Sequence, residues 1–303
     1  MVTPDDAIDA IRGTGGAQPG QRALHAKGKL YRGTFTATPD AARLCRAAHL
    51  SGSTVPALIR FSNGAGDPAA KDNAPGIRGM AVKFTLPDGK ITDIVCISTN
   101  GFPVSNGADF LGLLQAIAAT KPDSPKPTPI EAFLGSHPAA AKAVAMPQPI
   151  PESYATQPFF GVNAFKFTNA AGEIKFGRYQ LVPEAGAHFL SDDDAAKLPP
   201  NFLSDSVKDR LKKGPVKFKL FVQLAQPGDV TNDATAVWPD SNPKVELGEI
   251  SIAKADPDSL ATEKKLLFVP TKLIDGIAPS DDPIIPLRGA AYGVSYGLRQ
   301  AGR

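Results

Sequence analysis

Hydrophobic and polar residues alternate along several short segments of the chain, as they do in strands with one buried face. The alternation is most regular over residues 216–224, where one face would carry Val216, Phe218, Leu220, Val222 and Leu224. Segments with turn sequences at their centres predict two hairpins, over residues 78–97 and 162–181. Further strands are expected over residues 57–63 and 245–252. The pattern therefore predicts a sheet whose strands are largely antiparallel.

Helical patterns lie at the two ends of the chain and in inserts between the strands. Thr3 followed by Pro4 predicts a helix that ends near the glycines around residue 15, and Thr38 followed by Pro39 predicts a second that ends near Gly52. Other helices are expected over residues 108–120, 130–134 and 204–213 and in the C-terminal tail.

Strands joined by hairpins, with helices at the margins, predict an α+β fold built on an antiparallel β-barrel. The proline-rich linkers isolate no second core, so one domain is expected over residues 1–303. Within it, an N-terminal helix and lead-in would reach residue 20, and the barrel core with its inserted helices would fill residues 20–300. A barrel of about eight strands can enclose one ligand.

Composition and charge argue against several functional classes. The net charge of +3 and the lack of basic runs argue against a nucleic-acid partner. No apolar stretch approaches the length that spans a bilayer, and the acidic N-terminal segment has no signal core, so no membrane partner and a cytoplasmic location are expected. The two cysteines, Cys45 and Cys96, form no C-x-x-C pair, and the four histidines lack metal-ligand spacing.

The C-terminal tail carries the first candidate chemistry. If it is helical, Arg288 and Tyr292 lie one turn apart on the same face. A fixed positive charge next to a phenol favours the ionised form, and tyrosine is a known axial ligand of haem iron. Arg299 follows about two turns later, where a cation could meet a haem propionate. Without support from elsewhere, a packed tyrosine and a solvated arginine would be the simpler interpretation.

Support comes from motifs that follow one another through the chain: R-x-x-H-A-x-G from Arg22, R-F-S from Arg60, R-G-x-A-V-K-F from Arg78, D-x-V from Asp93 and N-x-x-P from Asn100. The tail adds R-x-x-x-Y-x6-R in the same order. Together these segments resemble the core of the haem catalases over roughly residues 20–300, most closely the short catalase-related peroxidases. Several motifs in family order are far more specific than any one of them.

The resemblance implies roles for residues near the N-terminal end. His25 would act as acid–base, taking a proton from one peroxide oxygen and returning it to the other. Ser62 would orient the His25 ring, and Arg60, on the same strand face, would pair with a haem propionate. Asn100 would donate a hydrogen bond to bound peroxide, although it stands about three residues later than in typical catalases. A loop-capping asparagine is the alternative for Asn100, and a core histidine for His25.

The resemblance also implies roles at the other end. Tyr292 would be the axial ligand of the haem iron, with Tyr296 as its rival, and the arginine one turn before Tyr292 decides between them. Arg22 and Arg299 would bind the propionates together with Arg60, while a surface charge is the alternative for Arg22. Asn163 stands where the family has a histidine, so a hydrogen bond to Arg288 is expected to survive.

The function implied by the resemblance is that of a haem b peroxidase. It would reduce H2O2 or an organic hydroperoxide with a small organic electron donor; whether weak catalase activity accompanies this is left open by the sequence. Two alternatives remain open: a haem carrier or sensor, and an isomerase of fatty-acid hydroperoxides that resembles an allene oxide synthase. A homo-oligomer such as a dimer is expected, and the eight-stranded barrel is expected to enclose the haem.

Overall fold

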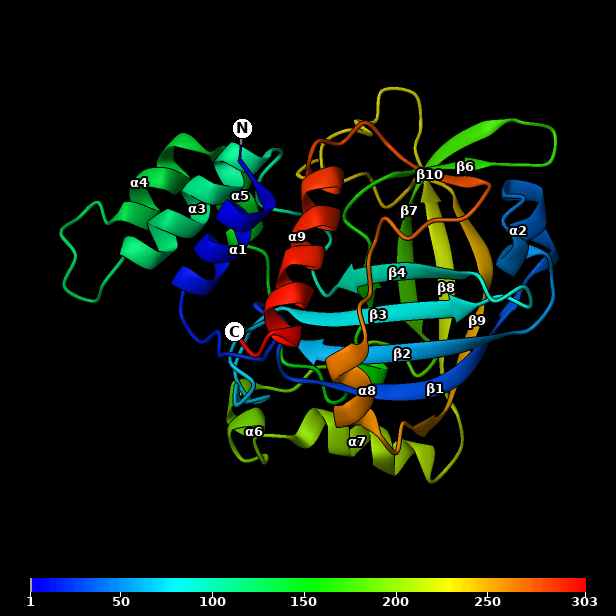
Figure 1. Cartoon of the computed structure of the whole chain (residues 1–303), viewed down its shortest axis with the longest axis horizontal. Coiled ribbons are helices and arrows are strands. Elements are labelled where there is room, and N and C mark those ends of the chain that lie inside the picture. The colour runs from blue at the N-terminus through cyan, green and yellow to red at the C-terminus, as the bar shows by residue number, and fades with distance from the viewer. Residues whose placement is uncertain (1) are drawn as a thin grey trace.

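The computed structural model describes residues 2–303, apart from the side chain of Leu260. Its strands are β1 (Gly28–Ala37), β2 (Val55–Asn63), β3 (Arg78–Thr85), β4 (Ile91–Ile97), β5 (Phe159–Phe160), β6 (Phe165–Thr168), β7 (Ile174–Pro183), β8 (Val216–Leu224), β9 (Lys244–Ala255) and β10 (Ile277–Pro279). They form one sheet in the order β10-β6-β7-β5-β4-β3-β2-β1-β9-β8, and β7 also pairs with β8. That pairing closes eight strands into an antiparallel barrel (Figure 1).

The helices lie outside the barrel. They are α1 (Pro4–Gly13), α2 (Pro39–Leu44), α3 (Gly107–Ala119), α4 (Pro129–Ser136), α5 (Pro138–Val144), α6 (Asp192–Ala196), α7 (Phe202–Leu211), α8 (Ser259–Lys265) and α9 (Ile284–Gln300). In Figure 1, α9 runs past the ends of the strands, with α1, α3, α4 and α5 gathered beyond it. No helix among the described residues has the length and apolar character needed to cross a bilayer.

The α+β barrel predicted from the sequence is confirmed, and so are most of its elements. Both hairpins form, and β8 has the predicted bounds. The helix after Thr38 is shorter than predicted, because Cys45 adopts an extended conformation (φ −149°) and Arg46 N–H donates to the carbonyl of Thr168 (2.9 Å). Pairing with the β6–β7 hairpin therefore ends α2 at Leu44.

The barrel interior is filled by side chains. Tyr31, Phe35, Phe61, Phe159 and Phe218 are among the fully buried residues of one continuous core. Phe61 makes a stacked contact with Tyr154 at 5.2 Å between ring centroids and an edge contact with Tyr31 at 5.5 Å. The expectation that the barrel encloses haem is therefore wrong, because its lumen is occupied by aromatic and aliphatic residues.

Candidate functional site

A cavity of about 650 Å³ lies on the outer side of the barrel wall, a volume typical of sites for small ligands and cofactors. On β2, β3 and β4 its wall is built from cross-strand neighbours: Ser62 pairs with Gly79, and Gly79 with Ile97. One face of α9 forms a facing wall, because the lining residues recur every three or four positions at Ile284, Leu287, Arg288, Ala291, Tyr292, Ser295, Tyr296 and Arg299. Helix α1 adds Ala7, Ile8 and Ile11.

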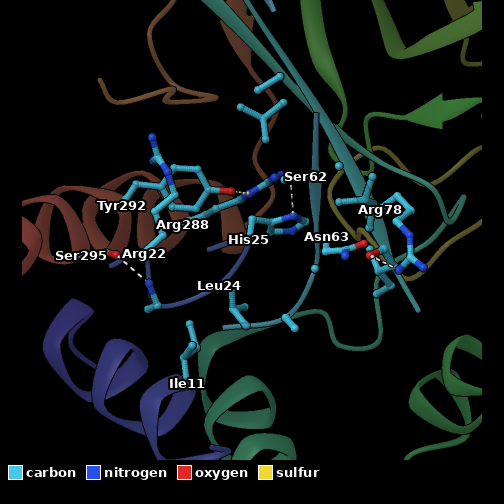
Figure 2. A pocket seen from close by; sticks show the side chains of 18 of the residues that line it. Ile11, Arg22, Leu24, His25, Ser62, Asn63, Arg78, Arg288, Tyr292 and Ser295 are labelled. Carbon is cyan, nitrogen blue, oxygen red and sulfur yellow. Dashed lines mark hydrogen bonds between the residues drawn. The ribbon is translucent and has the colours of Figure 1, made fainter. Parts of the chain in front are cut away.

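His25 reaches the cavity from the segment before β1 (Figure 2). Its backbone has φ 55°, and in the described part of the chain no other non-glycine residue has a positive φ. This costly conformation is held by the hydrogen bond from His25 N–H to the carbonyl of Gly64 (3.1 Å). Nδ1 of the ring is hydrogen-bonded to Ser62 Oγ at 3.0 Å. The ring nitrogen Nε2 is left for a ligand in the cavity.

Gly79 allows the imidazole to lie against the strand wall. A Cβ atom at this position would be 2.8 Å from both His25 Nδ1 and Ser62 Oγ, closer than side chains tolerate. The absence of a side chain is therefore a structural requirement for the His25–Ser62 pair. In the sequence this glycine belongs to the R-G-x-A-V-K-F motif, which by itself indicates no role for it.

The surroundings of His25 keep its imidazole neutral. Burial, followed by the positive charges of Arg60, Arg288 and Arg22, lowers the pKa of His25 to about 3. An imidazole with such a pKa is uncharged at neutral pH, and one of its nitrogens can act as a hydrogen-bond acceptor. It can therefore accept a hydrogen bond from a ligand bound in the cavity.

Tyr292 and Arg288 meet on the cavity face of α9 as the sequence predicts. Arg288 Nε donates to Tyr292 Oη at 3.2 Å, and Arg288 Nη1 donates to Asn163 Oδ1 at 2.8 Å. The predicted hydrogen bond of Asn163 is thus present. Asn163 Nδ2 in turn donates to Asp282 Oδ2 at 2.8 Å. A donor aimed at Oη stabilises negative charge on that oxygen, which suits a metal ligand.

The rival tyrosine has a different environment. Tyr296 also lines the cavity, but its hydroxyl donates to the carbonyl of Lys265 (3.4 Å), and its ring lies 5.1 Å from the guanidinium of Arg299. No cation donates to its oxygen among the described residues. Tyr292 is therefore the better metal ligand of the two.

Arg22 and Arg299 line one edge of the cavity, and Arg60 lies close to them without lining it. Arg22 Nη2 and Arg299 Nη2 both donate to the carbonyl of Leu266, at 2.9 and 2.8 Å. Arg60 Nε donates to Glu263 Oε1 at 2.6 Å. Burial and the charges of Arg60 and Arg299 lower the pKa of Arg22. These groups repel one another, so the edge is a site prepared for anionic groups.

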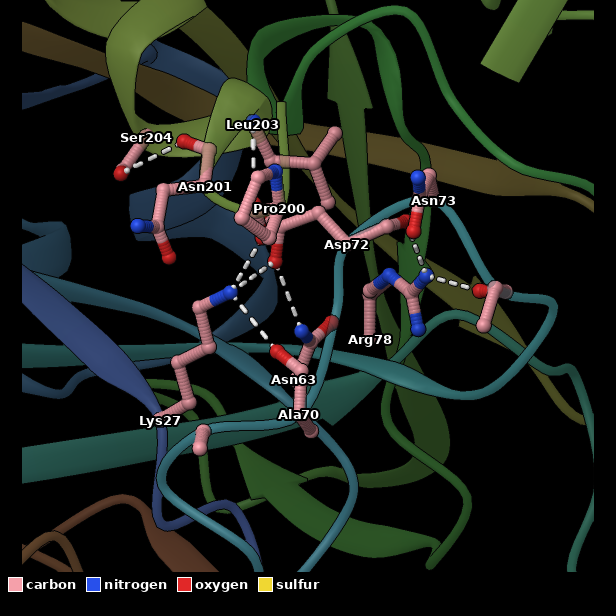
Figure 3. Close-up of polar contacts among 12 residues, drawn as sticks. Lys27, Asn63, Ala70, Asp72, Asn73, Arg78, Pro200, Asn201, Leu203 and Ser204 are labelled. Atoms are coloured by element: carbon pink, nitrogen blue, oxygen red, sulfur yellow. Dashed lines mark hydrogen bonds and ion pairs between the residues drawn. The ribbon is translucent and has the colours of Figure 1, made fainter. Parts of the chain in front are cut away.

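The loop between β2 and β3 forms a rim of the cavity and is held by buried charges (Figure 3). The carboxylate of Asp72 accepts hydrogen bonds from Asn63 Nδ2 (2.8 Å) and from the backbone N–H of Leu203 (3.1 Å), and forms an ion pair with Lys27 (2.8 Å). Arg78 Nη2 donates to the carbonyls of Asp72 (3.0 Å) and Ala74 (2.6 Å). This network fixes the loop next to His25.

The structure brings His25, Ser62, Arg22, Arg288, Tyr292 and Arg299 to the cavity. Asn100 is half-buried in the turn after β4 and does not line the cavity, whereas Ile97 and Phe102 on either side of it do. The register explains this: β4 ends at Ile97, opposite Gly79, so the strand reaches the cavity before Asn100. Its contact with peroxide stays a prediction that the cavity geometry does not support.

The residues fit the haem group implied by the sequence. A tyrosine backed by a guanidinium faces a neutral histidine across largely apolar walls, and arginines collect at one edge, where acidic substituents of a flat ligand could bind. The described residues contain no cluster of three or more His, Cys, Asp or Glu side chains that could hold a bare metal ion.

A family model described as catalase matches residues 17–301 of the chain. The chain belongs to the catalase family. A catalase-related peroxidase from Mycolicibacterium paratuberculosis is 48% identical over 301 residues, which cover 98% of this chain and 95% of that protein. A catalase-related peroxidase from Synechococcus elongatus is 35% identical over 308 residues, covering 99% of this chain and 90% of that protein.

The catalase fold is also found among solved structures. A fungal catalase superposes with a TM-score of 0.83 at 22% sequence identity, over 93% of this chain and 60% of its own. A bacterial catalase gives a TM-score of 0.82 at 21% identity, over 93% of this chain and 58% of its own. These similarities establish the shared fold.

Proposed function

We propose that the protein is a haem-dependent peroxidase that reduces H2O2 or an organic hydroperoxide with a small organic electron donor. Membership of the catalase family and the similarity to two proteins named catalase-related peroxidase support a reaction with peroxide. The observation that carries the proposal is the arrangement of one cavity. Tyr292, with Arg288 donating to its oxygen, lies on the helix wall, and neutral His25 lies on the strand wall.

The residues that would hold haem b come from both ends of the chain. Tyr292 would ligate the iron, and Arg22 and Arg299 would bind the propionates, with Arg60 beside them. Haem iron supplies the redox chemistry that cleaves the peroxide O–O bond. We propose one haem-binding domain over residues 1–303, in which the barrel supports the strand wall.

The chain's own contribution to the reaction is proton transfer and positioning. His25 accepts the proton of the bound peroxide at Nε2 and returns it to the departing oxygen, so that water or an alcohol leaves. Its low pKa keeps the nitrogen available over the whole neutral range. Ser62 and Gly79 fix the ring plane during both transfers. The apolar walls limit competing proton exchange with water.

The test is a pair of matched substitutions on α9. Tyr292→Phe should lose haem binding and peroxidase activity by at least the roughly 10- to 100-fold that follows from the loss of a residue supporting a metal ligand. Tyr296→Phe should keep both, because Tyr296 donates to a backbone carbonyl. The absorption spectrum of the purified protein and steady-state assays with and without a reducing donor measure the two properties.

Three results would contradict the proposal. Purified protein that binds no added hemin excludes a haem enzyme. Peroxide consumption that needs no donor and yields a rearranged hydroperoxide indicates the isomerase. Unchanged peroxide consumption after His25→Ala indicates a haem carrier or sensor in which the imidazole has no catalytic part.

A further inference from the structure

Arg60 is bound by an acidic side chain of the same protein. Its Nε and Nη2 donate to the two carboxylate oxygens of Glu263, at 2.6 and 3.3 Å. The Arg60 side chain is 5% exposed and that of Glu263 15%, so this bidentate pair is largely shielded from water. Nη2 also donates to the carbonyl of His25 (2.9 Å). Strand β2 is thereby tied to α8, which lies 203 positions later in the chain.

The pairing separates Arg60 from the two other arginines of the edge. Arg22 and Arg299 line the cavity, whereas neither Arg60 nor Glu263 does. Those two guanidiniums donate to the backbone carbonyl of Leu266, which carries only a partial negative charge. In the described part of the chain, these three guanidiniums and one carboxylate give a formal net charge of +2.

We propose that Glu263 is a haem-positioning residue whose carboxylate competes with a haem propionate for Arg60. The inference rests on the proposed function, because it takes the cavity to be a haem site. Haem carries two propionates, so the net charge of +2 at the edge balances them without leaving a guanidinium unpaired. Glu263 keeps Arg60 bound to α8, and Arg22 and Arg299 bind the propionates.

Two consequences follow for haem binding. The strength of haem retention is limited by the Arg60–Glu263 pair, because a propionate gains Arg60 only when Glu263 releases it. The segment that carries Glu263 also carries Leu266, and Tyr296 donates to the carbonyl of Lys265 (3.4 Å). Arg299 also donates to the carbonyl of Leu266, so this segment stays attached to the end of α9 when Glu263 releases Arg60.

The experiment compares haem release from the full-length protein loaded with hemin and with hemin dimethyl ester, whose propionates carry no charge. Excess apomyoglobin captures the released porphyrin, and absorbance gives the rate. Glu263→Gln should slow hemin release by about tenfold, which corresponds to about 1.4 kcal/mol, because Arg60 becomes free to bind a propionate. The same substitution should leave release of the ester unchanged.

Two controls define the comparison. Glu249→Gln removes the glutamate of a more exposed ion pair, that of Glu249 on β9 with Lys217 (3.0 Å), outside the cavity, and should leave both rates unchanged. Glu263→Asp keeps the charge on a shorter side chain and should slow hemin release less than Glu263→Gln; it also serves if the glutamine variant fails to fold. Thermal unfolding of each loaded protein reports whether the fold is preserved.

Each outcome of this experiment either supports or overturns the competition between Glu263 and a propionate. Slower release of hemin alone supports the competition. Equal or faster release of hemin from Glu263→Gln overturns it and leaves Glu263 as a structural partner of Arg60. Equal slowing of hemin and its ester also overturns it, because the effect would not depend on the propionate charges. Wild-type protein that binds no hemin defeats the proposed function, and the inference with it.

Discussion

Two neighbouring cross-strand rows on β2, β3 and β4 differ in their role: one belongs to the barrel core and the other faces the cavity. Phe61, Met80 and Cys96 form one row of the barrel core; all three are almost completely buried, and Met80 and Cys96 also reach the cavity. The adjacent row, Ser62, Gly79 and Ile97, points outward to the cavity. The rows are one residue apart along each strand, so alternation alone assigns them to opposite faces.

The difference between the rows lies in side-chain volume. On β2 and β3, the inner row adds the large side chains of Phe61 and Met80 to a close-packed core, where buried apolar volume contributes to the free energy of folding. The outer row combines a hydroxyl with a missing side chain, and this leaves space for the imidazole of His25. The same strands therefore provide stability on one face and a reaction site on the other. Substitutions on the two faces should affect different measurements.

Removing the imidazole supported by the outer row gives the largest expected effect. His25→Ala should lower kcat/KM for peroxide by about 10²- to 10⁴-fold, the range for loss of a general acid–base. The Soret spectrum and the thermal midpoint should change little, since Tyr292 and the barrel core are untouched. Stopped-flow kinetics with peroxide measures the loss.

A surface histidine provides the control for this substitution. His188→Ala removes an exposed ring whose Nε2 bonds only to the nearby carbonyl of Ala185 (2.9 Å), and activity should be unchanged. If His25→Ala retains wild-type turnover, the proton must be handled by another group and the outer row has no catalytic meaning.

The inner row should show the reverse behaviour. Phe61→Ala should lower the free energy of unfolding by about 3–5 kcal/mol, because it removes a fully buried ring that contacts Tyr31, Tyr154, Phe159 and Phe218. Turnover per bound haem should stay within a few-fold of wild type. Denaturant unfolding gives the first quantity, and haem-normalised kinetics the second.

Phe176→Ala is the matched control for the inner row. Phe176 lies on β7, outside the fully buried core, with Lys166 5.7 Å from its ring centroid, so its loss should cost much less. Equal costs for the two phenylalanines would show that the barrel interior is not the main source of stability.

Periodicity predicted the barrel where strands are half-buried and regular. β8 was found with its observed bounds, because Val216 to Leu224 alternate without interruption. Helix α1 was found from its cap, and the capping box between Thr3 and Asp6 is present. Helix α8 was missed, since Ser259–Lys265 has neither a capping hydrogen bond nor an apolar stripe. Its place depends on tertiary contacts such as the Arg60–Glu263 pair, which no local pattern encodes.

The candidate site divides in the same way. The motifs singled out His25, Ser62, Arg288 and Tyr292, and all four line one cavity; only the Arg288–Tyr292 pair follows from spacing within one element. Asp282, which supports Asn163 across 119 positions, was missed. The location of the cavity was also predicted wrongly. Alternation of hydrophobic and polar residues shows that a strand has two faces. Which face lines the cavity depends on where α9 packs.

The smallest expected effect comes from adding a single carbon atom to the outer row. Gly79→Ala adds a Cβ that would lie 2.8 Å from His25 Nδ1 and Ser62 Oγ, so the imidazole must move outward. A displacement of about 1 Å can cost up to about 100-fold in rate, and we expect a loss of roughly tenfold in kcat/KM. The free energy of unfolding should change by less than about 1 kcal/mol, since alanine restricts the unfolded chain and suits a strand no worse than glycine.

Gly135→Ala separates this effect from a general response to losing a glycine. Gly135 lies in α4, and no atom is within 4 Å of the position that its Cβ would occupy, so turnover should be unchanged. Pre-steady-state rates at several pH values complete the measurement. A ring displaced by the Gly79 substitution should lose rate uniformly above pH 4, because the low pKa of His25, about 3, keeps it neutral there. A Gly79→Ala protein with full activity would mean that the strand wall does not position the imidazole, and the contrast between the two rows would then reduce to packing alone.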